Sequence, residues 1–192
     1  RSGEGYITYP RTDSRRLPDD YPNQVLETLD SFKNSKYDTY SRKILQNNLV
    51  SSNDKKVFVS KKVSDHFAII PTSVIPKSGK LSEQENKIYD LIVRRFLAIF
   101  YPPVVTQETI RDTQIGDIHF KTRGKILIDK GWKEVLESTT TETILNTVKE
   151  NELAHCVSLS KLDNTTNPKP RYTDATLLRA METAGNDLGD EE

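Results

Sequence analysis

The segment SEQENKIYDLIVRRFLAIFYPP, residues 82–103, constrains the fold more than any other part of the chain. Ser82 and Glu85 form the Ser-x-x-Glu pattern of a capping box, which is typical of the first turn of a helix. Apolar residues then recur at helical spacing at Ile88, Leu91, Ile92, Phe96 and Ile99. We expect this face to pack on the core. Pro102 and Pro103 end the helix, because proline has no backbone N–H to donate.

Two further helices are predicted before this one. Residues 17–32 and 36–49 both carry apolar side chains at helical spacing. Asp19 or Asp20 could cap the first of them, because a short acidic side chain accepts hydrogen bonds from exposed N–H groups. We therefore expect a mainly helical domain over residues 1–102.

From residue 104 the pattern becomes that of strands. Residues 104–136 alternate apolar and polar side chains on both sides of Gly116, which predicts a β-hairpin turning there. Residues 152–163 resemble a further strand. The fold class is therefore α+β, with a strand-rich unit over residues 103–162 after the helical domain.

The rest of the chain, residues 163–192, is predicted to begin a third unit. A linker-like string, NTTNPKP, precedes a helix that Thr173 caps and Gly185 ends. The sequence lacks an initial methionine, and we expect it to be a fragment of a larger protein.

Composition excludes some classes of protein. One cysteine, Cys156, excludes an internal disulfide and suits a reducing cytoplasm. No apolar run approaches the roughly 20 residues that cross a bilayer. The formal net charge is zero, but residues 1–80 contain 14 Lys and Arg against 9 Asp and Glu. That excess could form a local face that attracts phosphate, although chance asymmetry explains it equally well.

The string ITYPRTDS places Tyr9 two residues from Arg11, so that in extended backbone both side chains leave the same face. A tyrosine hydroxyl has a pKa near 10 and is a poor nucleophile without help. A guanidinium stabilises the negative charge of a phosphoryl group. Ser14 adds a hydroxyl, and Arg15 and Arg16 add further positive charge. The string predicts a tyrosine that attacks a phosphate. A packing tyrosine is the plainer alternative.

Five strings occur in order along nearly the whole chain: GYITYPRTDS, SDHFAIIPT, KIYDLIVRRFLAIFYPP, GWKEVL and PKPRYTDATLLRAMETAG. The first resembles the active-site segment of the type IA DNA topoisomerases, particularly the bacterial topoisomerase I and III branches. The second is similar to that family's His-x-Ala-Ile-x-Pro-Thr motif. The third resembles the helix that leads out of the family's active-site domain, and the last two resemble further family segments.

The resemblance implies roles for individual residues. Tyr9 would be the nucleophile, and Arg11 would stabilise the phosphate and the tyrosine. The DNA-binding residues would be His66, Arg171, Lys169, Ser14, Arg15 and Arg16. His66 corresponds to the family histidine that approaches the scissile strand, with a structural histidine at a helix start as the alternative.

The resemblance also implies a reaction and an architecture. In this family the tyrosine cuts single-stranded DNA through a transient 5′-phosphotyrosine and rejoins it without ATP after another strand has passed. Residues 1–102 would be the gate domain of a torus, residues 103–162 part of its strand-rich arch, and residues 163–192 the start of the domain that holds the single strand. The parent enzyme would be a bacterial monomer, cytoplasmic and associated with the nucleoid.

One part of the family pattern is missing from the chain. The family binds Mg²⁺ through an Asp-x-Asp cluster and places a glutamate at the leaving oxygen, and these groups precede the tyrosine. No Asp-x-Asp occurs here. We therefore expect Mg²⁺ to serve the parent enzyme, no metal site in this chain, and little or no activity from the chain alone.

Two other interpretations stay open from the residues alone. Tyrosine recombinases and type IB topoisomerases also use a tyrosine with Arg and His partners, but there the tyrosine follows them, whereas Tyr9 precedes His66 and Arg171. The chain could instead be a non-catalytic module that binds single-stranded DNA or acts as a hinge.

Overall fold

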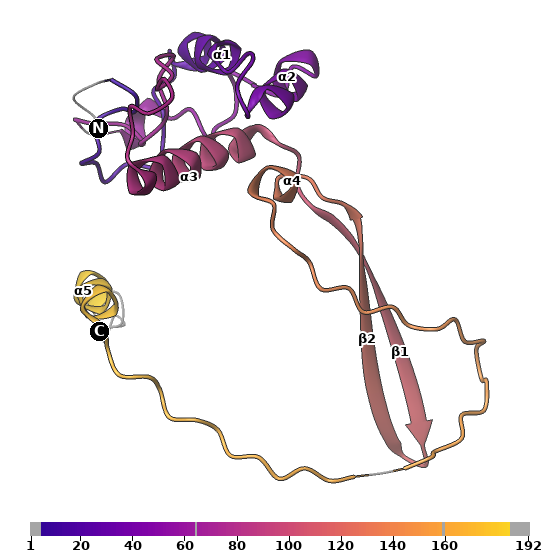
Figure 1. Ribbon diagram of the computed structural model, residues 1–192. Helices are drawn as coiled ribbons and strands as arrows, with labels where there is room; N and C mark the ends of the chain where they lie inside the picture. The colour runs from indigo at the N-terminus through magenta and orange to yellow at the C-terminus, as the bar shows by residue number, and fades with distance from the viewer. Residues whose placement is uncertain (1–4, 64, 159, 185–192) are drawn as a thin grey trace. The chain divides into compact units, whose positions relative to one another are not determined.

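A computed structural model describes residues 5–63, 65–158 and 160–184 of the chain. The chain divides into two compact units, residues 1–149 and residues 150–192, each considered by itself. The first unit contains α1 (Pro22–Ser31), α2 (Asp38–Gln46), a 3-10 helix, η2 (Ser60–Lys62), α3 (Glu83–Phe100), β1 (Val105–Ile115), β2 (Ile118–Asp129) and α4 (Lys133–Leu136), and the second contains α5 (Asp174–Thr183) (Figure 1). The predicted α+β class is confirmed.

The predicted N-cap of α1 is wrong. The helix begins after Tyr21, which makes no side-chain cap, and Pro22 occupies the first turn. Proline suits this position because its fixed φ is helical and it has no N–H to satisfy. Asp19 lies before the helix, where its backbone N–H donates to the Ser60 hydroxyl at 2.8 Å. The predicted second helix is confirmed in α2.

The long helix α3 is confirmed, but its predicted buried face is wrong. Ser82 and Glu85 form the expected capping box, and the helix ends at Phe100, with Tyr101 in extended backbone. The side chains that enter the core are Tyr89, Val93, Phe96, Leu97 and Phe100. Of the predicted set only Phe96 is fully buried, whereas Ile88, Leu91 and Ile99 are 58%, 57% and 51% exposed.

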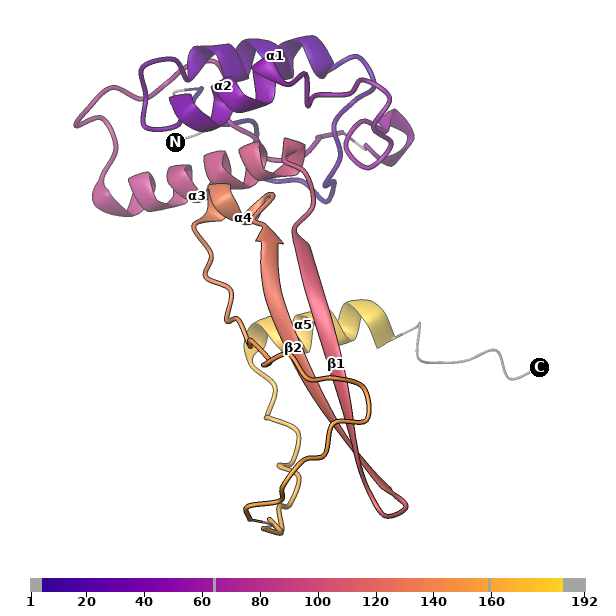
Figure 2. The same ribbon diagram turned by 90° about the vertical axis from the view of Figure 1, so that its right-hand side faces the viewer.

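The core of the first unit lies between α3 and the pair α1 and α2 (Figure 2). Its largest fully buried side chains include Phe32, Phe58 and Phe96. Phe58 comes from the segment after α2, and Val135 of α4 is also buried in the same cluster. The helices and the loop that joins α2 to α3 therefore share one hydrophobic core.

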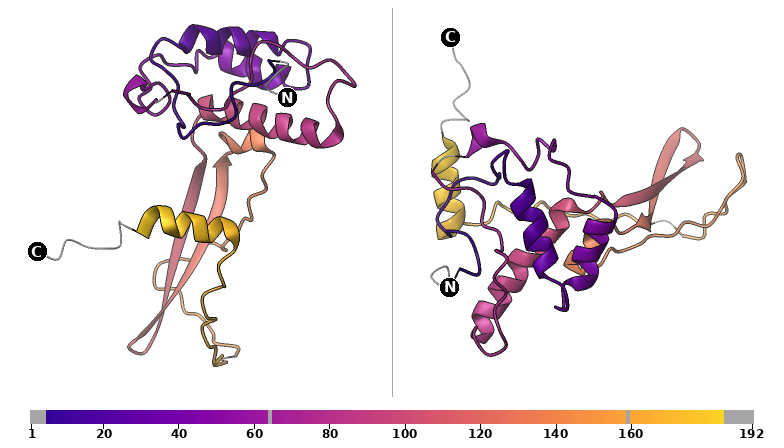
Figure 3. Two further views of the ribbon diagram at one scale, coloured as in Figure 1. Left: turned by 90° about the vertical axis from the view of Figure 1, so that its left-hand side faces the viewer. Right: turned by 90° about the horizontal axis from the view of Figure 1, so that it is seen from above.

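Two segments distant in sequence pair beside these helices. Ile7 bridges Pro71 in the antiparallel sense and Leu17 bridges Phe58 in the parallel sense. The backbone N–H of Thr8 donates to the carbonyl of Ile70 at 3.0 Å. Residues 5–17 are consequently held along described residues of the segment 57–72. Figure 3 gives two further views of the chain.

The hairpin predicted after α3 is confirmed. β1 and β2 are antiparallel, with Ile115 opposite Ile118 across the turn, and Gly116 has a φ of +57°. Gly131 closes the base of the hairpin with a φ of +47°, and a Cβ there would lie 2.5 Å from the carbonyl oxygen of Pro102. The described residues of the predicted strand 152–163 form no strand, because they make no ladder with a neighbour.

The second unit contains one described helix. Thr173 and Thr176 form a capping box at the start of α5, which confirms Thr173 as the cap. Gly185, which we expected to end this helix, lies outside the described residues. No helix in the described part of the chain is both long enough and apolar enough to span a membrane.

Candidate functional site

The candidate site is built where the segment around Tyr9 pairs with the segment around His66. The Tyr9 and His66 rings have centroids 4.5 Å apart and an interplanar angle of 38°. The Tyr9 side chain is 52% exposed and His66 is also exposed. Tyr9 is thus a surface tyrosine in contact with a histidine, unlike Tyr37 and Tyr89, which are buried in the core.

Two threonine hydroxyls hold the segments together on either side of Tyr9. Thr8 donates to the carbonyl of Ala68 at 3.0 Å and accepts from the N–H of Ile70 at 2.9 Å. Thr12 donates to the carbonyl of His66 at 2.8 Å. These bonds fix the backbone of the segment around His66 against the backbone of the segment around Tyr9.

Three arginines follow Tyr9 on the same segment. Arg11 and Arg15 are exposed and Arg16 is half-buried. None of the three forms an ion pair with any carboxylate in the described part of the chain. Their donors are therefore available to an anionic ligand, and a guanidinium binds phosphate oxygens with good geometry.

Ser14 has a structural position in this site. Its hydroxyl donates to the carbonyl of Lys62 at 2.8 Å and accepts from the N–H of Arg16 at 3.1 Å. The hydroxyl proton is thereby engaged within the protein. Ser14 holds η2 beside the segment that follows Tyr9.

The two remaining predicted DNA-binding residues belong to the second unit. Lys169 and Arg171 lie on the segment before α5, and both are exposed. The structure therefore brings together the predicted residues of the first unit, Tyr9 and His66 foremost, and places Lys169 and Arg171 in a separate unit.

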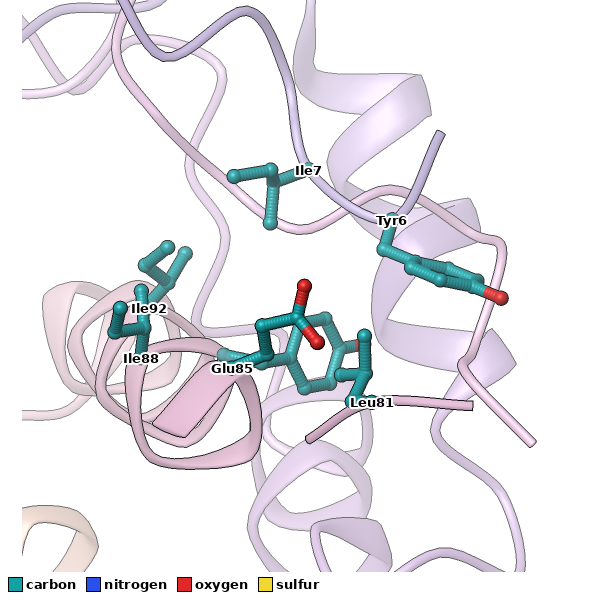
Figure 4. A pocket seen from close by; sticks show the side chains of 7 residues that line it. Tyr6, Ile7, Leu81, Glu85, Ile88 and Ile92 are labelled. Carbon is teal, nitrogen blue, oxygen red and sulfur yellow. The ribbon is translucent and has the colours of Figure 1, made fainter. Parts of the chain in front are cut away.

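A pocket next to the tyrosine segment has a different character. Figure 4 shows that its lining is largely apolar, with one carboxylate, and comprises Tyr6, Ile7, Leu81, Glu85, Ile88, Tyr89 and Ile92. Burial raises the pKa of Tyr89 to about 12, and its hydroxyl has no hydrogen-bond partner among the described residues. Glu85 already accepts from the N–H of Ser82. A pocket lined in this way does not suit a phosphate.

The residues near Tyr9 do not fit a metal ion. Nowhere in residues 5–63, 65–158 and 160–184 do three or more His, Cys, Asp or Glu side chains converge as ligands would. Mg²⁺ binds through carboxylates and waters, and the Asp13 carboxylate beside the hollow at Ser14 has no second carboxylate in that lining.

Sequence reasoning missed the positioning threonine Thr8 and the lysines of η2, Lys61 and Lys62. Thr8 directly precedes Tyr9 and Thr12 follows it by three positions in ITYPRTDS, and a threonine hydroxyl that is not fully exposed needs a hydrogen-bond partner. That the partners are the carbonyls of His66 and Ala68 depends on a pairing across more than 50 residues. No local pattern signals such a pairing.

Comparisons with known proteins give one consistent result. A family model described as DNA topoisomerase matches residues 3–190. DNA topoisomerase 3 of Bacillus cereus is 36% identical over 186 residues, and that of Bacillus licheniformis is 37% identical over 185 residues. DNA topoisomerase 3 of Staphylococcus epidermidis is 32% identical over 188 residues. These alignments cover 92%, 92% and 97% of the chain but only 25%, 25% and 26% of the relatives.

Proposed function

The chain belongs to the type IA DNA topoisomerases, and on this premise we propose that it supplies the tyrosine that cuts and rejoins single-stranded DNA. The observation that carries the proposal is the half-exposed Tyr9 held against His66. Free cations at Arg11 and Arg15 support it. The family assignment removes the recombinase alternative, in which the tyrosine would follow its partners.

The proposed step is an exchange of phosphate esters. The Tyr9 hydroxyl oxygen would form a bond to phosphorus while the bond from phosphorus to the 3′ oxygen breaks. The phenol proton leaves, and the departing 3′ oxygen takes up a proton. One ester replaces another, so the energy of the broken bond is kept in the 5′-phosphotyrosine and no ATP is needed. Reversal of the step rejoins the strand.

Arg11 and His66 have distinct parts in this proposal. Negative charge develops on the non-bridging oxygens of the phosphate during transfer. The Arg11 guanidinium can stabilise it by donating two parallel N–H hydrogen bonds. His66 lies against the ring of Tyr9, where an imidazole N–H could hold the scissile strand beside the nucleophile. Arg171 and Lys169 would bind the strand from the second unit.

The chain spans about a quarter of the length of the relatives it matches, so the activity of the whole protein is part of the proposal. We propose that the Mg²⁺ used by the full enzyme is held by residues outside this chain, and that the 192-residue chain alone is inactive or nearly so. Relaxation of supercoiled plasmid by the chain alone would contradict this. Residues 1–102 would form the gate domain, residues 103–162 part of the arch, and residues 163–192 the start of the strand-holding domain of a monomer working at the nucleoid in the cytoplasm.

The test is the transfer of label from DNA to protein. Single-stranded oligonucleotides labelled at the 3′ or the 5′ end are mixed with the full-length protein, which is then denatured and examined for bound label. We expect transfer from 3′-labelled DNA only, lost in Tyr9→Phe and kept in the control Tyr6→Phe. Transfer from 5′-labelled DNA would refute the 5′-phosphotyrosine. If Tyr9→Phe still accepted label, another residue would be the nucleophile.

A further inference from the structure

A second pair of cations lies on the 3-10 helix η2, beside the segment that follows Tyr9. Lys61 and Lys62 line an open hollow together with Asp13, Ser14 and Val63. Both lysines are exposed, and neither forms an ion pair with a described carboxylate. Some other exposed lysines of the first unit are paired, such as Lys87 with Glu83 at 2.6 Å and Lys43 with Glu134 at 2.6 Å, whereas Lys121 and Lys125 of the hairpin, like Lys61 and Lys62, form no ion pair with a described carboxylate.

The position of this lysine pair relative to the tyrosine segment is built into the fold. Ser14 donates to the carbonyl of Lys62 at 2.8 Å, and the Ser60 hydroxyl accepts from the N–H of Asp19 at 2.8 Å. Between these bonds, Leu17 pairs with Phe58, which is fully buried. These contacts hold the backbone of η2 beside the segment that follows Tyr9.

The charges near this hollow favour an anionic polymer. Arg11, Arg15 and Arg16 lie on the segment 5–17, against which η2 is held. The lining of the hollow contains one carboxylate, that of Asp13. Lysine binds phosphate as a point charge without reading sequence, which suits contacts to a nucleic-acid backbone. The hollow is open to solvent, as a site for a continuous strand must be.

We propose that Lys61 and Lys62 bind backbone phosphates of the single strand that is joined to Tyr9, and so retain the cut end on this unit. The joining of the strand rests on the proposed function, whereas the phosphate binding does not. Ser14, whose hydroxyl donates to the carbonyl of Lys62, is five positions after Tyr9, so the Cα atoms of Tyr9 and Ser14 are at most about 18 Å apart. Stacked DNA advances about 3.4 Å per nucleotide, and the lysine pair is therefore reached within roughly five nucleotides of the tyrosine.

The test measures non-covalent binding, so that it does not depend on cleavage. The protein carrying Tyr9→Phe is titrated with a fluorescent single-stranded oligonucleotide at several salt concentrations, with and without Lys61→Gln and Lys62→Gln. Each phosphate contact to a single strand adds about 0.7 to the slope of log K against log salt. We expect the slope to fall in magnitude by about 1.4, which is roughly a 25-fold loss of affinity at 0.1 M salt.

A matched control removes the same charge elsewhere. Lys121→Gln with Lys125→Gln changes two exposed lysines of the β-hairpin and should leave the slope within error. An unchanged slope in the Lys61 and Lys62 variant would overturn the proposal, and so would an equal loss in the control. Failure of label transfer to Tyr9 with an intact slope effect would refute the proposed function alone.

Discussion

Thr12 offers the sharpest test of how the candidate nucleophile is positioned. Its hydroxyl donates to the carbonyl of His66 at 2.8 Å and accepts from the N–H of Ser14 at 3.0 Å. Thr12→Val keeps the branched shape of the side chain and removes both bonds. The expected result is a protein that folds but holds His66 less firmly beside Tyr9.

The magnitude follows from the bonds that are lost. A hydrogen bond contributes about 0.5–1.5 kcal/mol net, and water can replace part of it because Thr12 is only half-buried. We therefore expect the free energy of unfolding to fall by about 1–2 kcal/mol. If about 1.4 kcal/mol of this loss falls on the local equilibrium that holds His66 beside Tyr9, that arrangement becomes roughly tenfold less populated. The first cut then becomes roughly tenfold slower.

The assay is single-turnover formation of the covalent complex with 3′-labelled single-stranded DNA. Thr109→Val on β1 is the control, because Thr109 is exposed and its hydroxyl makes no described hydrogen bond. It should cleave at the wild-type rate. Cleavage by Thr12→Val at the wild-type rate, together with a reduced stability in urea, would show that the bond to His66 serves folding alone and would refute the positioning argument.

Three further predictions concern stability, each measured by urea unfolding of the wild type and the variant. Gly131→Ala should destabilise the hairpin base by more than about 1 kcal/mol, because the added Cβ meets the carbonyl of Pro102 in a left-handed backbone; an unchanged midpoint would contradict it. Burial alone would raise the pKa of Asp90, but hydrogen bonds from Lys36, Tyr37 and Arg94 outweigh it and hold that pKa below its usual value. The ionised Asp90 therefore adds to the free energy of unfolding above about pH 4, and this contribution is lost as the pH falls below that value. Asp90→Asn should remove this part of the pH dependence of stability; an unchanged pH dependence would contradict it. Phe96→Ala should cost about 3–5 kcal/mol, because the ring is buried and packs on Phe100 with centroids 5.3 Å apart; a cost below about 1 kcal/mol would mean that the core collapses around the gap.

Local chemistry made some elements predictable from the sequence. The capping box at Ser82, the proline stop after α3 and the turn at Gly116 each depend on residues close together in the chain. The buried face of α3 was not predictable in this way, because the helix carries two apolar stripes. Both repeat at helical spacing and share Phe96, and the one that also carries Tyr89 and Phe100 is buried, since aromatic rings remove more area from water.

In the candidate site, too, the residues could be predicted from local strings, whereas their arrangement could not. ITYPRTDS predicts Tyr9 and Arg11 as site residues by the chemistry that a phosphate requires, and the resemblance adds His66 to that prediction. What the sequence could not supply is the pairing that makes a site of them. The contact of Tyr9 with His66 spans 57 positions and depends on a shared core, so it follows from tertiary structure alone.

The base of the hairpin and the helices are joined in a way that bears on how the proposed gate could move. Arg94 of α3 binds the carbonyl of Val135 at 2.7 Å and the carboxylate of Glu137 at 2.9 Å. The N–H of Trp132 donates to the carbonyl of Pro102 at 3.0 Å, and Val135 is fully buried in the helical core. These contacts tie both ends of the hairpin to α3. An opening that carried Tyr9 away from a bound strand would therefore move the helices and the hairpin base as one body, and its hinge would lie further along the strands or beyond this unit.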